Sequence, residues 1–145
     1  VVTQNIDGLH QAAGSKRVWE LHGSVWRNTC MRCGKRFTAD YIRDDMREVP
    51  LCPCGGRIKP DVVLYGEGLD EGVLQGAVHD LRHADMLIVA GTSLTVYPAA
   101  GLVRYFHGKH LVLINRDVTP MDGEAELVLH EKVGEMLEKL VVRSV

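Results

Sequence analysis

The sequence predicts an α/β fold, a doubly wound parallel sheet that carries a small inserted cysteine module. Two observations lead to this prediction. In the second half of the chain, short apolar runs ending in glycine or polar residues alternate with amphipathic helical patterns, as expected of a parallel sheet covered by helices. The 4 cysteines all fall between positions 30 and 54, so they form one local module. With 145 residues, the chain is long enough to bury a core of its own.

The first half of the chain contains short elements separated by polar segments. Residues 1–3 read as the end of a strand, 4–14 as a polar loop with one helical turn, and 21–29 as a short strand. The mixed charges of 37–47 predict an exposed helix between the cysteine pairs. The apolar run at 62–65 predicts a buried strand after the second pair.

The second half alternates helices and strands. Apolar residues recur at helical spacing in the amphipathic segments, and continuous apolar runs mark strands of a parallel sheet. In order, the predicted elements are a helix at 69–84, strands at 86–90, 111–114 and 127–129 with a helix at 96–106 after the first, and a final helix at 133–140. Pro98 is tolerated in the first turn of its helix.

Composition excludes several classes of protein. The net charge of −2 gives no sign of a nucleic-acid-binding or membrane-surface protein. No apolar run reaches the roughly 18 residues that a membrane span needs, and no signal peptide opens the chain. We therefore expect a cytoplasmic protein without nucleic-acid or membrane partners. The sequence does not indicate an oligomeric state.

The cysteines form two close pairs, Cys30 with Cys33 and Cys52 with Cys54. Two such pairs across a spacer are typical of a structural zinc site, in which four thiolates leave no position for water or substrate. Free buried thiols or two disulfides are the alternatives, and a non-secreted chain favours metal. Only Pro53 separates the second pair, where two residues are usual, which should change the local turn more than the ligand count.

Polar groups follow three predicted strands at the ends where an open parallel sheet binds its ligands. They are Gln4, Asn5 and Asp7 after the first strand, Gly91, Thr92 and Ser93 after the second, and Asn115, Arg116 and Asp117 after the third. Each cluster alone is as easily a turn or a helix cap. Three on one sheet edge favour a nucleotide site. No Gly-x-Gly-x-x-Gly fingerprint is present in the sequence.

One histidine differs in its setting from the others. His22 lies between the polar loop and the cysteine module, in the segment Glu20–Leu21–His22–Gly23. Histidine is the side chain best suited to accept a proton near neutral pH. Spacing alone does not favour a catalytic role for it over a non-catalytic one.

The chain resembles a known family, the sirtuins, which are NAD-dependent protein lysine deacylases. It is most similar to the bacterial members. The matching motifs occur in the family's order along essentially the whole chain. They are TQNIDGLH at 3–10, ELHG at 20–23, the cysteine pairs, PDVVLYGE at 60–67, GTSL at 91–94 and IN at 114–115.

The resemblance implies a role for each matching residue. His22 corresponds to the catalytic histidine, and Cys30, Cys33, Cys52 and Cys54 to the ligands of one structural Zn²⁺. The implied NAD contacts are Gln4, Asn5, Ile6, Asp7, Gly91, Thr92, Ser93, Asn115, Arg116, Asp117 and Lys132. The implied substrate contacts are Val62 and Val63 at the acyl-lysine tunnel, and Gly66, Glu67 and Val96 along a peptide that binds as an added strand.

The implied reaction is deacylation of protein lysine, which transfers the acyl group to ADP-ribose and releases nicotinamide. His22 would act as general base on a ribose hydroxyl, and acylated-lysine proteins or peptides would be the partners. A protein ADP-ribosyltransferase of the same fold and a zinc-ribbon binding module without catalysis remain as alternatives.

The family's opening segment, including its glycine-rich phosphate loop, has no counterpart in this sequence. We therefore expect an N-terminally truncated fragment with an incomplete Rossmann-like sheet. Such a fragment should be inactive and poorly soluble, and should bind NAD too weakly to measure. The implied organisation is 1–29 as part of the NAD-binding domain, 30–57 as the zinc-binding module, and 58–145 as the remainder of the NAD-binding domain.

Overall fold

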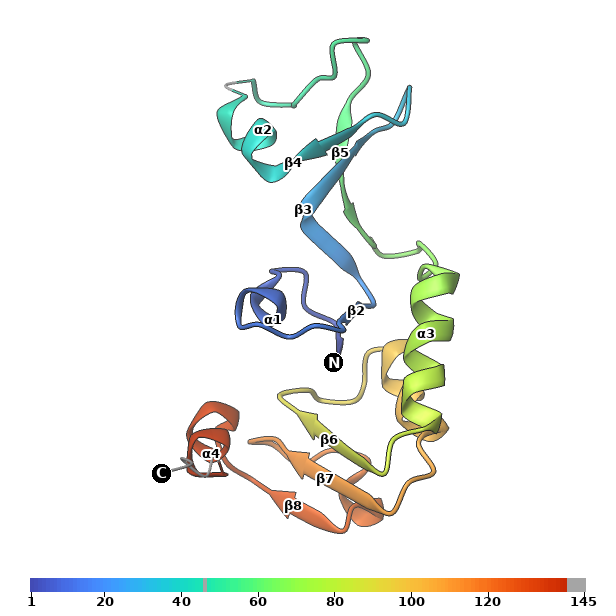
Figure 1. The fold of residues 1–145 in the computed structure, drawn as a ribbon, viewed down its shortest axis with the longest axis vertical. Coiled ribbons are helices and arrows are strands. Elements are labelled where there is room, and N and C mark those ends of the chain that lie inside the picture. Colours follow the sequence, from blue (N-terminus) through green and yellow to red (C-terminus); the bar gives the residue numbers. More distant parts are fainter. Residues whose placement is uncertain (46, 141–145) are drawn as a thin grey trace. The chain divides into compact units, whose positions relative to one another are not determined.

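The computed structural model describes residues 1–45 and 47–140, which divide into two units after Leu74. Figure 1 shows the first unit in blue to green and the second in light green to red. Helix α3 (Glu71–Arg82) runs across the division.

The first unit begins with a two-stranded parallel sheet. Strand β1 (Val2–Thr3) pairs with β2 (Trp19–Glu20), and the short helix α1 (Leu9–Ala12) lies in the connection between them. Thr3, at the end of β1, and Leu21, directly after β2, are buried. The polar loop that follows β1 therefore starts from a fixed strand end.

The rest of the first unit is an antiparallel sheet with the order β4-β3-β5. The long central strand β3 (Gly23–Cys30) pairs with β4 (Arg36–Thr38) on one side and β5 (Ile58–Val62) on the other. Helix α2 (Ala39–Asp44) follows β4, and the Thr38 hydroxyl caps it by accepting the Tyr41 amide at 3.4 Å. Cys30, Cys52 and Ile58 form a small buried cluster here.

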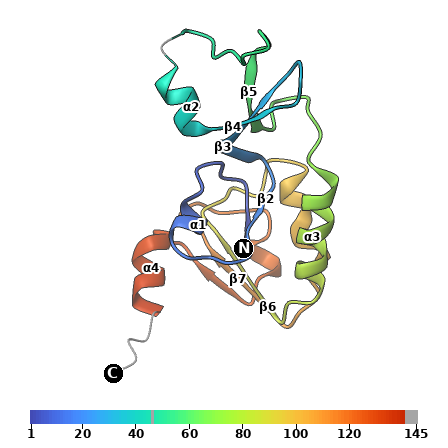
Figure 2. The ribbon, with the colours of Figure 1, turned by 45° about the horizontal axis from the view of Figure 1, so that its top comes forward.

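The second unit is built on a three-stranded parallel sheet with the order β6-β7-β8. Its strands are β6 (Met86–Ala90), β7 (His110–Ile114) and β8 (Leu127–Leu129). They run side by side in Figure 1, and helix α4 (Val133–Leu140), which is labelled in Figure 2, follows β8. The connections contain two 3₁₀ helices, η1 (Ala99–Tyr105) and η2 (Asp122–Glu124). Leu113 and Ile114 on the central strand are fully buried.

The α/β prediction is confirmed by the parallel pairing of β6, β7 and β8 and of β1 with β2. Most predicted elements are present with shifted ends. The segment 37–47 is an exception, because Phe37 belongs to β4 and pairs with Asn28, and the helix spans Ala39–Asp44; Met46 lies outside the described residues.

The predicted buried strand at 62–65 is wrong. Strand β5 spans Ile58–Val62 instead, and Leu64 and Tyr65 are 54% and 107% exposed. The strand forms where its backbone can pair with β3 and ends at a turn in which the Glu67 amide donates to the Leu64 carbonyl at 3.0 Å. Pairing partners, rather than apolar character, therefore decided where the strand lies.

The predicted helix at 96–106 is the shorter 3₁₀ helix η1, which starts after Pro98. Proline has no amide hydrogen and a fixed φ, so it suits a helix start better than a helix interior. The Gly101 amide donates to the Pro98 carbonyl at 3.1 Å, an i to i+3 bond. In the part of the chain that the structure describes, no helix is long and apolar enough to cross a membrane.

Candidate functional site

The four cysteine sulfurs converge in the first unit. Cys30 ends β3, Cys33 lies in the turn between β3 and β4, and Cys52 and Cys54 lie in the loop before β5. The Cys30 and Cys54 sulfurs are 3.6 Å apart, as are those of Cys33 and Cys52, and all four lie within 4.8 Å of one another. None forms a disulfide. The structure therefore brings together the four predicted zinc ligands, which lie up to 24 positions apart in the sequence.

The donor set fits a structural zinc ion. A tetrahedral Zn²⁺ with Zn–S bonds of about 2.3 Å separates its sulfurs by about 3.8 Å, close to the observed spacing. Backbone bonds hold the knuckles, since the Gly34 amide donates to the Cys30 carbonyl at 3.0 Å and the Gly55 amide to the Cys52 carbonyl at 2.8 Å. Four thiolates would close the coordination shell, so such a metal supports folding and performs no chemistry.

The sulfurs also compete for ionisation. Burial opposes the Cys30 thiolate, but the amides of Cys33 and Arg32 and the neighbouring sulfurs outweigh it and lower the pKa of Cys30 to about 6. The Cys54 amide favours the Cys52 thiolate, yet burial and the other three sulfurs raise the pKa of Cys52 to about 12. One thiolate thus makes the others harder to form. A divalent cation removes that repulsion.

His22 lies in the turn between β2 and β3, half-buried. Its Nδ1 is 3.0 Å from the carbonyl oxygen of Gln4. Because a carbonyl can only accept, Nδ1 carries the proton in this bond and Nε2 is left as the basic nitrogen. The His22 carbonyl in turn accepts the Val63 amide at 3.0 Å. The structure therefore places His22 between the polar loop after β1 and the end of β5.

The loop that carries Asn5, Ile6 and Asp7 is held by hydrogen bonds at several points. The Asn5 amide donates to the Thr3 hydroxyl at 3.1 Å, and the Asp7 carboxylate accepts the Leu9 amide at 3.0 Å at the start of α1. The side chain of Asn5 is exposed, and that of Asp7 is half-buried. With His22 bonded to Gln4, this loop and the histidine form one connected structure.

Two of the predicted substrate residues also lie beside His22. Val62 pairs with Gly23 at the end of β5, and Val63 follows it. Glu67, after the turn, accepts the Leu64 amide at 2.9 Å, and this bond together with nearby Lys59 holds the pKa of its carboxyl below the usual range. The neighbouring Gly66 has a left-handed φ of 86°. Val96 belongs to the second unit, where it is half exposed.

In the second unit, the predicted nucleotide-binding groups gather at the carboxyl ends of the parallel strands. The Gly91 amide donates to the Ile114 carbonyl at 3.0 Å, and the Asn115 amide to the Leu129 carbonyl at 3.1 Å. Gly91 has a φ of 62°, a conformation that glycine adopts readily. The strand ends are therefore adjacent, as an open parallel sheet requires for ligand binding.

The polar side chains at these ends are already organised by local bonds. The Thr92 hydroxyl accepts the Leu94 amide at 3.2 Å, and the Ser93 and Thr95 hydroxyls are 2.7 Å apart. The Asn115 amide group donates to the Asp117 carbonyl at 2.7 Å. The remaining two predicted contacts are exposed: Arg116 lies 4.0 Å from Asp117, and Lys132 pairs with Glu135 at 2.9 Å.

Sequence reasoning missed several residues that shape the site. Trp26 donates its indole N–H to the Asp7 carbonyl at 2.7 Å. Gly56 packs against the cysteine cluster so closely that a Cβ there would lie 2.7 Å from the Cys30 sulfur. The side chain of Asp45 is only 8% exposed and bonds Arg47 at 2.7 Å in the loop that leads to Cys52. Of these residues, only Gly56 had a signal in the sequence, because the Gly55–Gly56 pair directly follows Cys54.

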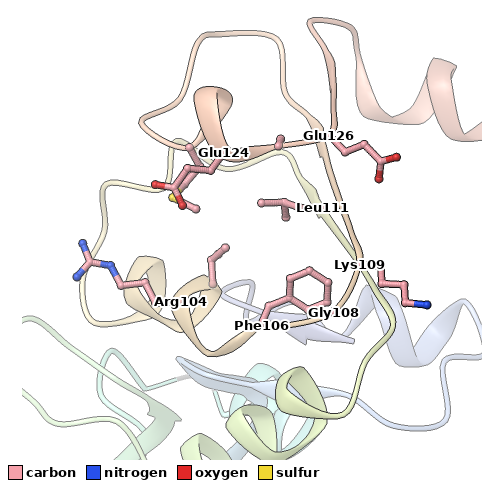
Figure 3. A pocket seen from close by; sticks show the side chains of 10 residues that line it. Arg104, Phe106, Gly108, Lys109, Leu111, Glu124 and Glu126 are labelled. Carbon is pink, nitrogen blue, oxygen red and sulfur yellow. The ribbon is translucent and has the colours of Figure 1, made fainter.

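A cavity of about 670 Å³ lies elsewhere in the second unit (Figure 3). Its lining includes Phe106 and Leu111, which point into it, and Lys109 and Glu126, which point away. It lies beside the amino end of β7, whereas Gly91 and Asn115 follow strands at their carboxyl ends. None of the predicted site residues lines it.

Comparisons with known proteins agree with this geometry. The Sir2 family model matches residues 1–98. NAD-dependent protein deacetylases from Clostridium acetobutylicum and Staphylococcus aureus are 56% and 47% identical over 142 residues, which is 97% of this chain. The chain spans 58% of the length of these curated relatives.

Solved structures give the same result. A complex described as Sir2 with a p53 peptide and NAD⁺ has a TM-score of 0.88 at 44% identity, covering 97% of this chain and 60% of that one. Sir2 bound to an acetylated peptide has a TM-score of 0.88 at 42% identity, with coverage of 97% and 61%. The matched family model, the arrangement of the strands and the cysteine cluster lead to one conclusion: this chain belongs to the Sir2 family.

Proposed function

We propose that the protein is an NAD-dependent protein lysine deacylase that transfers the acyl group to ADP-ribose and releases nicotinamide. The observation that carries the proposal is the bond from His22 Nδ1 to the Gln4 carbonyl. It leaves Nε2 basic in a half-buried position next to the loop that carries Asn5 and Asp7. Relatives of the chain that are named NAD-dependent protein deacetylases also support the proposal.

His22 acts as the general base. With NAD bound, its Nε2 would take a proton from a ribose hydroxyl, and its Nδ1–H keeps the ring oriented through the Gln4 carbonyl. NAD, when bound, supplies the ribose carbon to which the acyl oxygen is transferred as nicotinamide leaves. A positioned general base contributes about 10²- to 10⁴-fold to the rate.

The residues for NAD binding divide by unit. In the first unit, Gln4, Asn5, Ile6 and Asp7 bind the nicotinamide riboside end. Those of the second unit bind the ADP-ribose end. They are Gly91, Thr92, Ser93, Asn115, Arg116, Asp117 and Lys132. Hydroxyl and amide donors beyond the ends of parallel strands support this assignment, because they suit phosphate and ribose oxygens.

The acyl-lysine substrate binds beside His22. Val62 and Val63 contact the acyl chain, and their position against the Gly23 and His22 backbone supports that role. The exposed segment that contains Gly66 and Glu67 binds the peptide backbone, as does Val96 in the second unit. Acylated-lysine proteins are thus the partners, and we place the reaction in the cytoplasm.

The zinc-binding module spans 30–57 within an NAD-binding domain formed by 1–29 and 58–145. The ion held by Cys30, Cys33, Cys52 and Cys54 fixes the strand β3 that starts beside His22. Loss of the ion should therefore affect catalysis through the fold rather than through the chemistry.

The test uses the full gene product that contains this chain, an acetylated peptide and NAD. Nicotinamide and free lysine in equal amounts support the proposal, together with a loss of about 10²-fold or more in His22→Ala at unchanged zinc content. Nicotinamide with ADP-ribosylated protein would assign transferase activity instead. Zinc-loaded protein that leaves NAD intact would point to a binding module. Either of these results overturns the proposal.

A further inference from the structure

A short segment near the start of β3 makes two further bonds to the loop of Asn5 and Asp7. The Ile6 carbonyl accepts the Val25 amide at 3.1 Å, and the Asp7 carbonyl accepts the Trp26 indole N–H at 2.7 Å. The first of these bonds is backbone to backbone and does not depend on the side chain at that position. The second depends wholly on a tryptophan.

The ring of Trp26 also covers the turn that follows Asp7. A Cβ on Gly8 would lie 2.9 Å from both Cδ1 and Nε1 of the indole, so the ring contacts the Gly8 backbone directly. Gly8 has a φ of 72°, which already favours glycine there. The Trp26 ring therefore fits against the turn only because position 8 is glycine, since any side chain there would collide with the indole.

Trp26 contributes little to a hydrophobic core, because 56% of it is exposed. The Trp26 backbone amide donates to the hydroxyl of Ser24 at 3.2 Å. Ser24 is only 1% exposed, so this bond ties the Trp26 backbone to a buried side chain. An indole that is half exposed but has its N–H bonded to a loop carbonyl is arranged to hold that loop.

We propose that Trp26 is a positioning residue for NAD, acting through the peptide between Asp7 and Gly8. This inference rests on the proposed function, which assigns Asn5 and Asp7 to the nicotinamide riboside end. If this peptide rotated, ψ of Asp7 and φ of Gly8 would change, and the Leu9 amide would move away from the Asp7 carboxylate and break their 3.0 Å bond. The indole bond prevents that rotation and so keeps the carboxylate oriented before NAD binds.

The experiment removes the bond with the smallest possible change of shape. In the full gene product, Trp26 is replaced by β-(3-benzothienyl)alanine, in which sulfur takes the place of the indole N–H, and separately by Phe. Val25→Ala is the matched control, because it shortens the neighbouring exposed side chain and keeps the backbone bond to Ile6. Measured quantities are KM for NAD and for acetylated peptide, NAD affinity by calorimetry, zinc content, and hydrogen exchange of the Leu9 amide.

Loss of one neutral hydrogen bond should raise KM and Kd for NAD about threefold to tenfold in both Trp26 variants. Leu9 should exchange faster, while the peptide KM and the zinc content stay unchanged. Val25→Ala should remain within about twofold of the wild type, below the cost of one hydrogen bond. Unchanged NAD affinity overturns the inference, as does a parallel loss of peptide binding and zinc, which would mark Trp26 as a structural residue.

The calorimetric measurement separates this inference from the proposed function. A wild-type protein that binds NAD but releases no free lysine contradicts the deacylase assignment, and the NAD affinity of the Trp26 variants still decides the role of this residue. A wild-type protein that does not bind NAD overturns both.

Discussion

His22 Nδ1 and the carbonyl oxygen of Gln4 lie 3.0 Å apart, across 18 positions of sequence. The bond fixes the ring tautomer and joins the histidine to the loop that carries Asn5 and Asp7. Because the Gln4 group is a backbone carbonyl, no side-chain substitution at Gln4 removes it. The orientation of the proposed base is therefore set by the path of the chain after β1.

The first prediction concerns the metal. Protein purified under native conditions should contain about one zinc per chain. Cys52→Ser should lose the metal and lower the unfolding temperature, because a buried ligand of the cluster is removed. Met31→Ser is the control, since Met31 is 70% exposed between two cluster residues and should retain zinc. Equal zinc content in both variants, measured by elemental analysis, would contradict the site.

Gly56→Ala should also weaken the metal site without touching a ligand. A Cβ at this position would lie 2.5 Å from the Arg32 Cβ and 2.7 Å from the Cys30 sulfur, so the knuckle would have to open. Overpacking of this kind costs about 1–3 kcal/mol. Zinc affinity measured by competition with a chelator should fall. Gly123→Ala, where a Cβ meets nothing within 4 Å, should leave it unchanged.

Gly23→Ala should displace His22 by separating β3 from β5. A Cβ at Gly23 would overlap the Asp61 carbonyl, and the φ of 76° is left-handed. Gly14→Ala is a sharp control, because its φ of 92° brings similar strain with no neighbour within 4 Å. Both variants should lose about 1 kcal/mol or more from strain, and only Gly23→Ala should also lose catalytic activity. Equal effects in unfolding and activity assays would show that the contact with Asp61 is unimportant.

Asp45 predicts an acid-dependent loss of stability in the cysteine module. The Arg47 side chain, with the amides of Arg47 and Leu51, holds the pKa of the Asp45 carboxyl well below its usual range. The folded pKa lies below the unfolded value, so the stabilisation is fully present above about pH 4 and is lost as the pH falls further.

The measurement for Asp45 is the difference in unfolding temperature between wild type and Asp45→Asn as a function of pH. Wild type should be the more stable at pH 7, and the difference should shrink below about pH 4. Metal loss in acid affects both proteins and cancels in the difference. The exposed neighbour Asp44, whose side chain is 71% exposed, provides the control Asp44→Asn with little effect. A difference that does not change with pH would show that the Arg47 pair does not stabilise the module.

Val63→Trp should weaken peptide binding more than NAD binding. Val63 bonds the His22 carbonyl through its amide, so its side chain is fixed close to the proposed base. The larger tryptophan ring would occupy the space proposed for the acyl chain. The proposed NAD-binding residues of the second unit would be unaltered. Separate titrations with acetylated peptide and with NAD check this. Equal losses for both ligands would indicate a damaged fold.

The sequence by itself determined the features that depend on residue type and short spacing. Two close cysteine pairs were enough to predict the cluster of Cys30, Cys33, Cys52 and Cys54. Apolar runs followed by polar groups were enough to predict that Gly91 and Asn115 follow adjacent parallel strands. Both patterns are local, because a knuckle or a strand end is formed by residues within a few positions.

Only the tertiary structure decided which distant groups meet. The strand expected at 62–65 formed earlier, at Ile58–Val62, because the β3 backbone was available there for pairing. The bonds of His22 to Gln4 and of Trp26 to Asp7 join segments 18 and 19 positions apart. A hydrogen bond to one backbone carbonyl produces no periodic pattern in the sequence. The partners of His22 and Trp26 could therefore be identified only from the folded chain.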